Sequence, residues 1–363
     1  MKAFTVGPVA EFPCTHMIHQ RDLPYFRSAE YSCLVNKCID MLSAIIGHKN
    51  SNSVFYMTCS GTGAMEAVVD NCVGYDEKSL VINGGTFGHR FCEILKKHNR
   101  SYDSIDLEWN EELTKNRFTG YDKKKYKFLF VNIHETSTGH LYDLSLLSKF
   151  AKENGMYLIV DAISSILADD YEMDKYGVDA TIFSSQKGLC LSPGLSFIAL
   201  SSELKDKVLR EKNSTSYYFN FESYINNINR GQTPFTPANM IIYELDCMLD
   251  LIMEKGGKSC WIESVKQKAL YFRDKIRKEG IEIPSEYNLS NALTPIIFKD
   301  IDAMEIYRFL SQKFSIYVNP CGGELASKIL RVAHIGNLSF ADFDDLVNKL
   351  KIAIQSVKTN DRK

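Results

Sequence analysis

The chain has 363 residues, of which 45% are hydrophobic and 24% are charged, and its formal net charge is -2. This length exceeds the usual size of a single domain, so one larger and one smaller domain are expected. The near-neutral charge provides no general attraction to nucleic acid or to anionic membrane surfaces, which leaves small molecules as the expected ligands.

The sequence also carries expectations about location. No apolar run reaches the roughly 18 residues that a membrane helix requires, and residues 1–12 lack a secretory apolar stretch with a small-residue cleavage site. Ten cysteines are spread from Cys14 to Cys321 without a C-x-x-C pair, which favours reduced, mostly buried thiols over a disulfide framework or a zinc site. We therefore expect a cytoplasmic protein.

In chain order, short apolar runs alternate with segments of helical period. The expected strands cover residues 53–59, 78–84, 126–134, 156–162, 179–185 and 195–201. Their continuous apolarity indicates strands covered on both faces, and a helical stretch at 143–155 separates two of them. The pattern predicts an α/β domain on a largely parallel sheet, whose ligands gather at the carboxyl ends of the strands. The lysine-rich segment 121–127 is expected to be a solvated loop.

The later part of the chain has a different pattern. Residues 202–236 are polar and aromatic without clear periodicity, so they are expected to form a connecting segment. Helices are expected at 239–257 and at about 259–279, followed by alternating strands and helices. This mixture predicts a smaller α+β domain at 258–363 and leaves 1–257 for the large domain.

A glycine-rich segment, SGTGAMEA at residues 60–67, stands between an apolar run and a helical pattern. Glycines permit a sharp turn, and a helix N-terminus offers unpaired N–H groups with a partial positive charge, which together make an anion site. Ser60 and Thr62 add hydroxyl donors. The segment is neither a P-loop nor a G-x-G-x-x-G fingerprint, and a glycine-rich helix start without a ligand is the alternative.

Two charged residues follow later strands. Asp161 comes directly after four apolar residues, where a carboxylate is costly unless a cation such as a protonated ring nitrogen meets it. Lys187 follows the next strand and a Ser-Ser-Gln turn, where desolvation and nearby cations lower the pKa of an amine enough for Schiff-base chemistry. The alternatives are a helix-capping or loop aspartate and a surface lysine.

These three features have one ligand in common. Pyridoxal phosphate requires an anion site for its phosphate, a carboxylate for its pyridinium nitrogen and a lysine for its aldehyde. The carboxylate keeps the ring nitrogen protonated, so that the cofactor can act as an electron sink when a substrate loses its α-proton. The sequence therefore predicts a pyridoxal phosphate site.

Eight short segments then resemble the class V aminotransferases of fold type I, in the branch with alanine–glyoxylate, serine–pyruvate and 2-aminoethylphosphonate–pyruvate transaminases. In order they are FTVGPV, SGTGAMEA, NGGTFGHR, HETSTG, VDAISS, SSQKG, TPFTP and LRVAHIG. The resemblance covers nearly the whole chain. It implies the fold type I pyridoxal-phosphate transferase architecture, a large domain with a mainly parallel seven-stranded sheet and a smaller α+β C-terminal domain.

The resemblance also implies roles for the residues that would hold the cofactor. Lys187 would form an internal aldimine with it and then move a proton between the substrate Cα and the cofactor C4′, and Asp161 would pair with the pyridine nitrogen. The phosphate would contact Ser60, Gly61, Thr62 and Gln186.

Three more residues match cofactor positions of the family. Phe87 matches the ring that stacks on the cofactor, where Trp or Tyr is commoner, and Thr136 matches a hydroxyl that touches the cofactor ring or its O3′. A core aromatic and a strand-end turn are the alternatives. Thr236 resembles the residue that reaches the phosphate from the neighbouring subunit, which implies a homodimer with shared sites; a turn before the helix at 239 is the alternative.

The substrate end of the site is implied by two further matches. Arg331 matches the arginine that grips a substrate carboxylate, a task that suits its planar fork. The residues after it, Val332-Ala333-His334, depart from the family's usual pattern. Gly7 lies in a loop that matches one lining the substrate pocket.

The implied activity is a ping-pong transamination from a small amino donor, alanine or serine, to pyruvate or glyoxylate. The aminophosphonate 2-aminoethylphosphonate is the alternative donor and would need further cationic contacts, for which His19, Arg21 and Arg230 are candidates. A lyase or desulfurase on the same fold is a further alternative, and only Cys321 loosely fits a desulfurase nucleophile. A protein that binds the cofactor without turnover is the last alternative, against which the presence of Lys187 argues.

Overall fold

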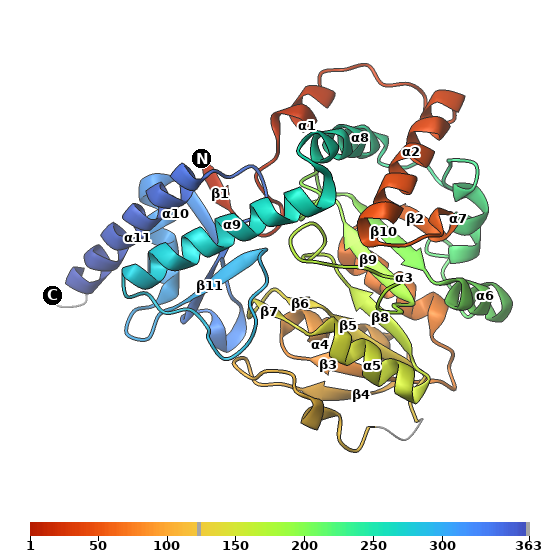
Figure 1. Cartoon of the computed structure of the whole chain (residues 1–363), viewed down its shortest axis with the longest axis horizontal. Coiled ribbons are helices and arrows are strands. Elements are labelled where there is room, and N and C mark those ends of the chain that lie inside the picture. Colours follow the sequence, from red (N-terminus) through yellow and green to blue (C-terminus); the bar gives the residue numbers. More distant parts are fainter. Residues whose placement is uncertain (122–124, 361–363) are drawn as a thin grey trace.

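The computed structural model describes residues 1–121 and 125–360. The loop expected at 121–127 includes residues 122–124, which lie outside the described residues. Across the described residues, two main sheets organise the chain, one of seven strands and one of four, and each is associated with its own hydrophobic core. Figure 1 shows these two sheets in separate parts of the molecule, with the C-terminal helices gathered around the smaller one.

The larger sheet confirms the predicted mainly parallel, seven-stranded architecture. In spatial order its strands are β2 (Val54–Thr58), β10 (Leu195–Leu200), β9 (Ala180–Ser184), β8 (Tyr157–Asp161), β5 (Phe128–Asn132), β3 (Lys78–Asn83) and β4 (Ser101–Asp106). Strand β10 is antiparallel to both neighbours, and the other pairs are parallel. Every residue of β5, β9 and β10 is buried, which explains why their sequences are mostly apolar rather than alternating.

Helices cover this sheet, and a short hairpin that forms a separate two-stranded sheet follows strand β5. The helices are α1 (Pro13–Ile18), α2 (Ala29–Ile46), α3 (Gly61–Cys72), α4 (Thr86–Lys97), α5 (Leu144–Asn154), α6 (Ser202–Glu211), α7 (Phe221–Ile228) and α8 (Asn239–Glu254). Strands β6 (His134–Glu135) and β7 (His140–Leu141) form the hairpin, and single 3-10 turns lie at Ser51–Ser53, Lys115–Phe118 and Gly323–Leu325. None of the helices in the described parts of the chain is long and apolar enough to cross a membrane.

The prediction of a connecting segment at 202–236 is wrong, because α6 and α7 lie within it. Helix α6 begins after Ser201, whose side chain accepts a hydrogen bond from the Leu204 N–H, and it buries only a narrow stripe of residues. Helix α7 buries four residues at helical spacing, namely Phe221, Tyr224, Ile225 and Ile228. The helical spacing of these apolar residues is present in the sequence, but the helix is short and contains asparagines, which are more typical of turns, so the pattern is hard to recognise.

The smaller sheet combines the two ends of the chain. Its order is β1 (Lys2–Phe4), β12 (Ile316–Pro320), β13 (Ile329–Ala333) and β11 (Leu293–Ile297), and α9 (Gly257–Lys278), α10 (Ala303–Phe314) and α11 (Phe340–Asn360) accompany it. Strand β1 pairs in parallel with β12. The first residues therefore lie with the C-terminal unit, whereas the sequence division assigned all of 1–257 to the large domain; a pairing partner so distant in sequence leaves no local signal.

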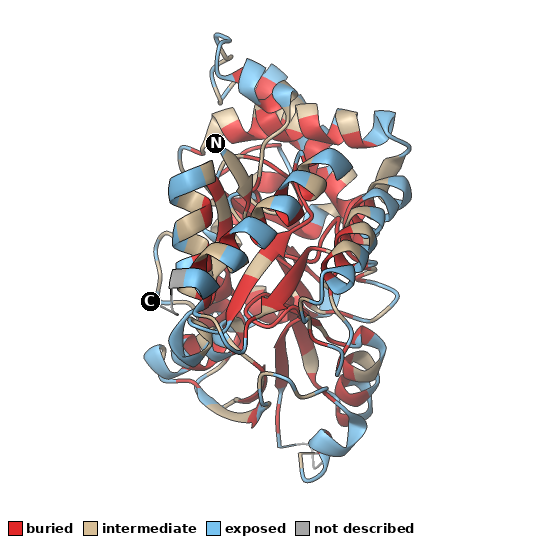
Figure 2. Cartoon of the chain, turned by 90° about the vertical axis from the view of Figure 1, so that its left-hand side faces the viewer, coloured by how far each residue is buried: buried red, intermediate tan, exposed pale blue. Residues whose placement is uncertain are grey.

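Helix α9 links the two units. It contacts both α8 and α11 and runs from the end of α8 to the small sheet (Figure 1). Figure 2 shows that strands are buried on this side of the molecule, while the helices expose their outer faces. Of the ten cysteines, five are buried and two, Cys33 and Cys260, are exposed, so burial is less general than expected.

Candidate active site

A cavity of about 250 Å³ lies where strands of the large sheet end and the small unit approaches them. Its wall includes residues that follow β2, β5, β8 and β9, together with residues of β12 and β13. Of the eleven predicted site residues, all but Thr236 line it: Gly7, Ser60, Gly61, Thr62, Phe87, Thr136, Asp161, Gln186, Lys187 and Arg331. Residues far apart in sequence thus meet at the carboxyl edge of the sheet, where ligands of such folds bind.

Lys187 and Asp161 are the two residues of this cavity with opposite charge and perturbed proton affinity. Burial lowers the pKa of Lys187 to about 8. The positive charges of Arg331 and Arg90 also lower this pKa, whereas the negative charge of Asp161 raises it. Burial also raises the pKa of Asp161 to about 6, although its carboxylate accepts a hydrogen bond of 2.8 Å from the Ile163 N–H. The site therefore presents an amine whose pKa lies much nearer neutrality than that of an ordinary lysine, and a buried acid able to meet a cation.

The N-terminal loop packs directly on the lysine. A Cβ atom at Gly7 would lie 3.0 Å from Cγ and 3.2 Å from Cε of Lys187, so the close approach depends on glycine. The neighbouring Val6 N–H donates a hydrogen bond of 2.7 Å to Oδ1 of Asn319 in β12. The loop that carries Gly7 is thereby tied to the small unit.

The start of α3 forms the glycine-rich wall. Ser60 is the N-cap of this helix, yet its side chain makes no capping hydrogen bond within the residues that the structure describes, so the hydroxyl is available to a ligand. A Cβ atom at Gly61 would lie 2.5 Å from Cδ1 of Ile163, so glycine keeps the turn compatible with the opposite wall. Thr62 Oγ1 accepts a hydrogen bond of 3.2 Å from Arg90. The helix N-terminus and these hydroxyls match the predicted anion site.

Phe87 stands at the start of α4 beside two cations. The Arg90 guanidinium carbon lies 4.7 Å and the Lys187 Nζ 5.1 Å from the centre of its ring. The buried carboxylate of Glu135 accepts hydrogen bonds from the N–H groups of Phe87 (3.2 Å) and Gly88 (3.0 Å). Glu135 therefore caps α4 and fixes the backbone that carries the Phe87 ring.

Arg331 is held in place by the backbone. Its Nη1 donates to the Thr136 carbonyl (2.8 Å) and its Nη2 to the Pro320 carbonyl (2.6 Å). Its buried Nε has no hydrogen-bond partner in the described parts of the chain. The guanidinium thus has a fixed orientation and a donor left for a ligand.

Several candidates do not line the cavity. Thr236 is exposed, in the segment before α8. His19 pairs with the buried Glu244 at 2.8 Å, Arg230 bonds to Asn227, and Arg21 also lies outside the cavity wall. Cys321 is buried, donates to the Ser137 carbonyl at 3.3 Å and has its pKa raised by burial, which disfavours the thiolate that a nucleophile requires.

The cavity also contains residues that sequence reasoning missed: Val6, Met65, Arg90, His134, Ile163, Ser164 and Asn319. Arg90 and His134 belong to the segments NGGTFGHR and HETSTG, the same segments that contain Phe87 and Thr136. Arg90 follows Phe87 by one helical turn, a spacing that brings side chains to the same face of a helix. No comparable sequence signal marks Asn319, which enters through the packing of the small unit.

The family model described as Aminotransferase class-V matches residues 25–341. The chain belongs to this family. It is 27% identical over 336 residues to the 42 kDa subunit of a soluble hydrogenase of Anabaena cylindrica, covering 90% of this chain and 86% of that protein. It is 25% identical over 347 residues to a serine–glyoxylate aminotransferase of Arabidopsis thaliana, covering 93% and 86%.

The fold of this class V aminotransferase is also that of solved structures. A solved alanine–glyoxylate aminotransferase of Nostoc sp. superposes with a TM-score of 0.90 at 24% identity, covering 98% of this chain and 96% of that chain. The predicted family, the enzyme class and the fold type I architecture are therefore confirmed. Family membership implies pyridoxal phosphate as cofactor.

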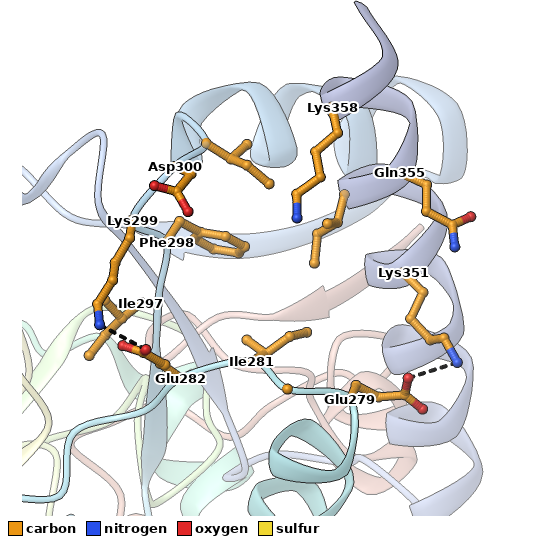
Figure 3. A pocket seen from close by; sticks show the side chains of 13 residues that line it. Glu279, Ile281, Glu282, Ile297, Phe298, Lys299, Asp300, Lys351, Gln355 and Lys358 are labelled. Carbon is orange, nitrogen blue, oxygen red and sulfur yellow. Dashed lines mark hydrogen bonds and ion pairs between the residues drawn. The ribbon is translucent and has the colours of Figure 1, made fainter. Parts of the chain in front are cut away.

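A second cavity, of about 350 Å³, lies in the small unit between the ends of α9, β11 and α11 (Figure 3). It is larger than the first, but none of the predicted site residues lines it. Figure 3 shows two of its lysines paired with glutamates, Lys299 with Glu282 and Lys351 with Glu279, each at 2.8 Å. The first cavity is therefore the candidate active site because of the residues that line it and not because of its volume.

Proposed function

We propose that this class V aminotransferase uses pyridoxal phosphate to transfer the amino group of a small amino donor, of the alanine or serine type, to glyoxylate or pyruvate in ping-pong order. The observation that carries the proposal is that Lys187, Asp161 and Arg331 line one cavity. The acceptor is supported by the relative that is a serine–glyoxylate aminotransferase.

The residues present fit the cofactor. Among the described residues, the lining includes three cations, Lys187, Arg90 and Arg331, and one acid, Asp161, which favours a ligand with a phosphate and a carboxylate. The free Ser60 hydroxyl and the start of α3 would hold the phosphate, with Gly61, Thr62 and Gln186, and Asp161 would hold the ring nitrogen. When bound, pyridoxal phosphate supplies an electron sink for the electrons left at the substrate Cα.

Lys187 is the residue proposed to hold and move the proton. Because burial lowers its pKa to about 8, about a tenth of its Nζ is unprotonated at pH 7, far more than for an ordinary lysine, and can accept a proton or attack a carbonyl carbon. Its contact with Gly7 limits where the side chain can move. Phe87, positioned by Glu135, would stack on the cofactor ring, and Thr136 would touch the ring or its O3′.

Arg331 is proposed to orient the substrate. Its fixed guanidinium with a free Nε suits one carboxylate, which a small amino acid and a 2-oxo acid both carry. A 2-aminoethylphosphonate donor stays the alternative, with Arg90 as the additional cation in the wall. A homodimer is also proposed, in which the exposed Thr236 reaches the phosphate of the neighbouring copy. The burial of Cys321 argues against a desulfurase.

The test is spectral. Protein purified with pyridoxal phosphate should be yellow, and a panel of amines should bleach that absorbance if they donate their amino group. Bleaching by alanine or serine supports the proposal, whereas bleaching only by 2-aminoethylphosphonate supports the alternative. Lys187→Ala, as the matched control, should not turn over; a colourless wild type or a normally active variant would overturn the proposal.

A further inference from the structure

His134 is a buried polar residue of the cavity to which no role has been given. It begins β6, is 2% exposed and lines the same cavity as Lys187. Its Nδ1 and Nε2 are both buried and have no hydrogen-bond partner within residues 1–121 and 125–360. An unpaired buried imidazole is costly, and a ligand that bonds to the ring would remove that cost.

The backbone places His134 directly after the residues that pair with the end of strand β8. In the register of β5 with β8, Asn132 lies opposite Asp161, and the Ile133 N–H donates to the Asp161 carbonyl at 2.9 Å. His134 follows immediately, and its carbonyl accepts a hydrogen bond of 3.4 Å from the Ser164 hydroxyl. The backbone position of His134 is therefore set by the sheet and by these main-chain contacts.

The charge state of His134 is also fixed. Burial lowers its pKa to about 3, and the positive charges of Lys187, Arg273 and Arg331 act in the same direction. The imidazole is therefore neutral at physiological pH, with one nitrogen as donor and the other as acceptor. It can offer an N–H without adding a further charge to a cavity already rich in cations.

We propose that His134 is a cofactor-binding residue whose imidazole N–H donates a hydrogen bond to the ring oxygen beside the aldehyde carbon of pyridoxal phosphate. This inference rests on the proposed function. That function assigns Asp161 to the ring nitrogen, the start of α3 to the phosphate and Lys187 to the aldehyde. The ring oxygen is the remaining polar atom of the cofactor, and His134 is two residues from Thr136, the other residue proposed to approach it.

The first experiment follows the absorbance of the bound cofactor against pH. His134→Leu removes the donor at similar volume, while His134→Gln keeps one. A donor stabilises negative charge on the ring oxygen and so favours the deprotonated form. Its loss should raise the pH midpoint of the absorbance change by about 1 to 2 units, the usual worth of a hydrogen bond to a charged group. The glutamine variant should shift less than half as far.

The matched control is His140→Leu. His140 is also buried, lies on β7 opposite Glu135 in the same hairpin and does not line the cavity. Damage to the hairpin alone would shift the midpoint in both leucine variants. A shift confined to position 134 supports the contact, whereas equal shifts, or none in His134→Leu, would overturn it.

The second experiment compares the affinity of pyridoxal phosphate with that of an analogue lacking the ring oxygen. Wild type and His134→Leu should bind the analogue within about twofold, whereas the cofactor should bind the variant on the order of tenfold more weakly. Equal losses for both ligands would place His134 against another atom and overturn the inference. If the leucine variant does not fold, wild type that binds cofactor and analogue equally would overturn it. Wild type that binds no cofactor at all would instead refute the proposed function.

Discussion

Glu135 makes a quantitative prediction possible, because its buried carboxylate satisfies several donors at once. It accepts hydrogen bonds from the N–H groups of Phe87, Gly88 and Ser137 and from the Asn132 amide, at 3.2, 3.0, 3.1 and 3.0 Å. Glu135→Ala would leave these donors without their acceptor inside the protein. At about 1 kcal/mol for each donor, the free energy of unfolding should fall by roughly 3–5 kcal/mol.

The assay is urea unfolding followed by circular dichroism, with Glu66→Gln as control. Glu66 is a helix carboxylate that is 43% exposed and pairs with His98 at 2.9 Å, so its loss should cost less than about 1 kcal/mol. The glutamine variant of Glu135 keeps one oxygen and should lie between alanine and wild type. Because Glu135 positions Phe87, the alanine variant should also bind pyridoxal phosphate more weakly. A Glu135→Ala protein within about 1 kcal/mol of wild type would refute the capping argument.

Three further predictions concern the neighbourhood of the lysine. Because the pKa of Lys187 is lowered to about 8, its rate of reaction with the cofactor aldehyde should increase with pH and reach half of its maximum near pH 8. A stopped-flow series over pH measures this rate, and a half-maximum above pH 10 would contradict the prediction. Gly188→Ala should lower the free energy of unfolding by about 1–3 kcal/mol in urea, because a Cβ at this position would lie 1.9 Å from the Ile166 carbonyl oxygen. The control is Gly322→Ala, which should leave stability unchanged because a Cβ there would meet no described atom within 4 Å. Arg331→Lys should raise KM for the amino acid by roughly tenfold to a hundredfold in steady-state assays, while the absorbance of bound cofactor stays unchanged. A KM like that of wild type would show that Arg331 does not bind the substrate.

The parts of the fold that could be predicted from the sequence are those whose signal is local. Strands such as β5 and β9 are buried on both faces, so their continuous apolar runs identify them. The edge strand β4 has the polar sequence SYDSID, of which only Ile105 is buried, and it carries no such run. The pairing of β1 with β12 depends on residues more than three hundred positions apart, which no local pattern reveals.

The same distinction applies to the site. Asp161 ends the buried strand β8 and Lys187 follows the buried strand β9, so sheet geometry alone places them at one edge. Arg90 lies one helical turn after Phe87, a local spacing that the sequence itself displays, whereas Asn319 enters the cavity through the approach of the small unit, which no local pattern specifies. The role of Thr236 depends on a second copy of the chain and stays a prediction.

The central claim is that the Lys187 amine forms a covalent bond with the pyridoxal phosphate aldehyde. It can be tested by adding the cofactor to the protein, reducing with borohydride and mapping the modified peptide by mass spectrometry. We expect a single phosphopyridoxyl adduct on Lys187, which Lys187→Ala abolishes. An adduct on another lysine, or none in the wild type, would contradict it.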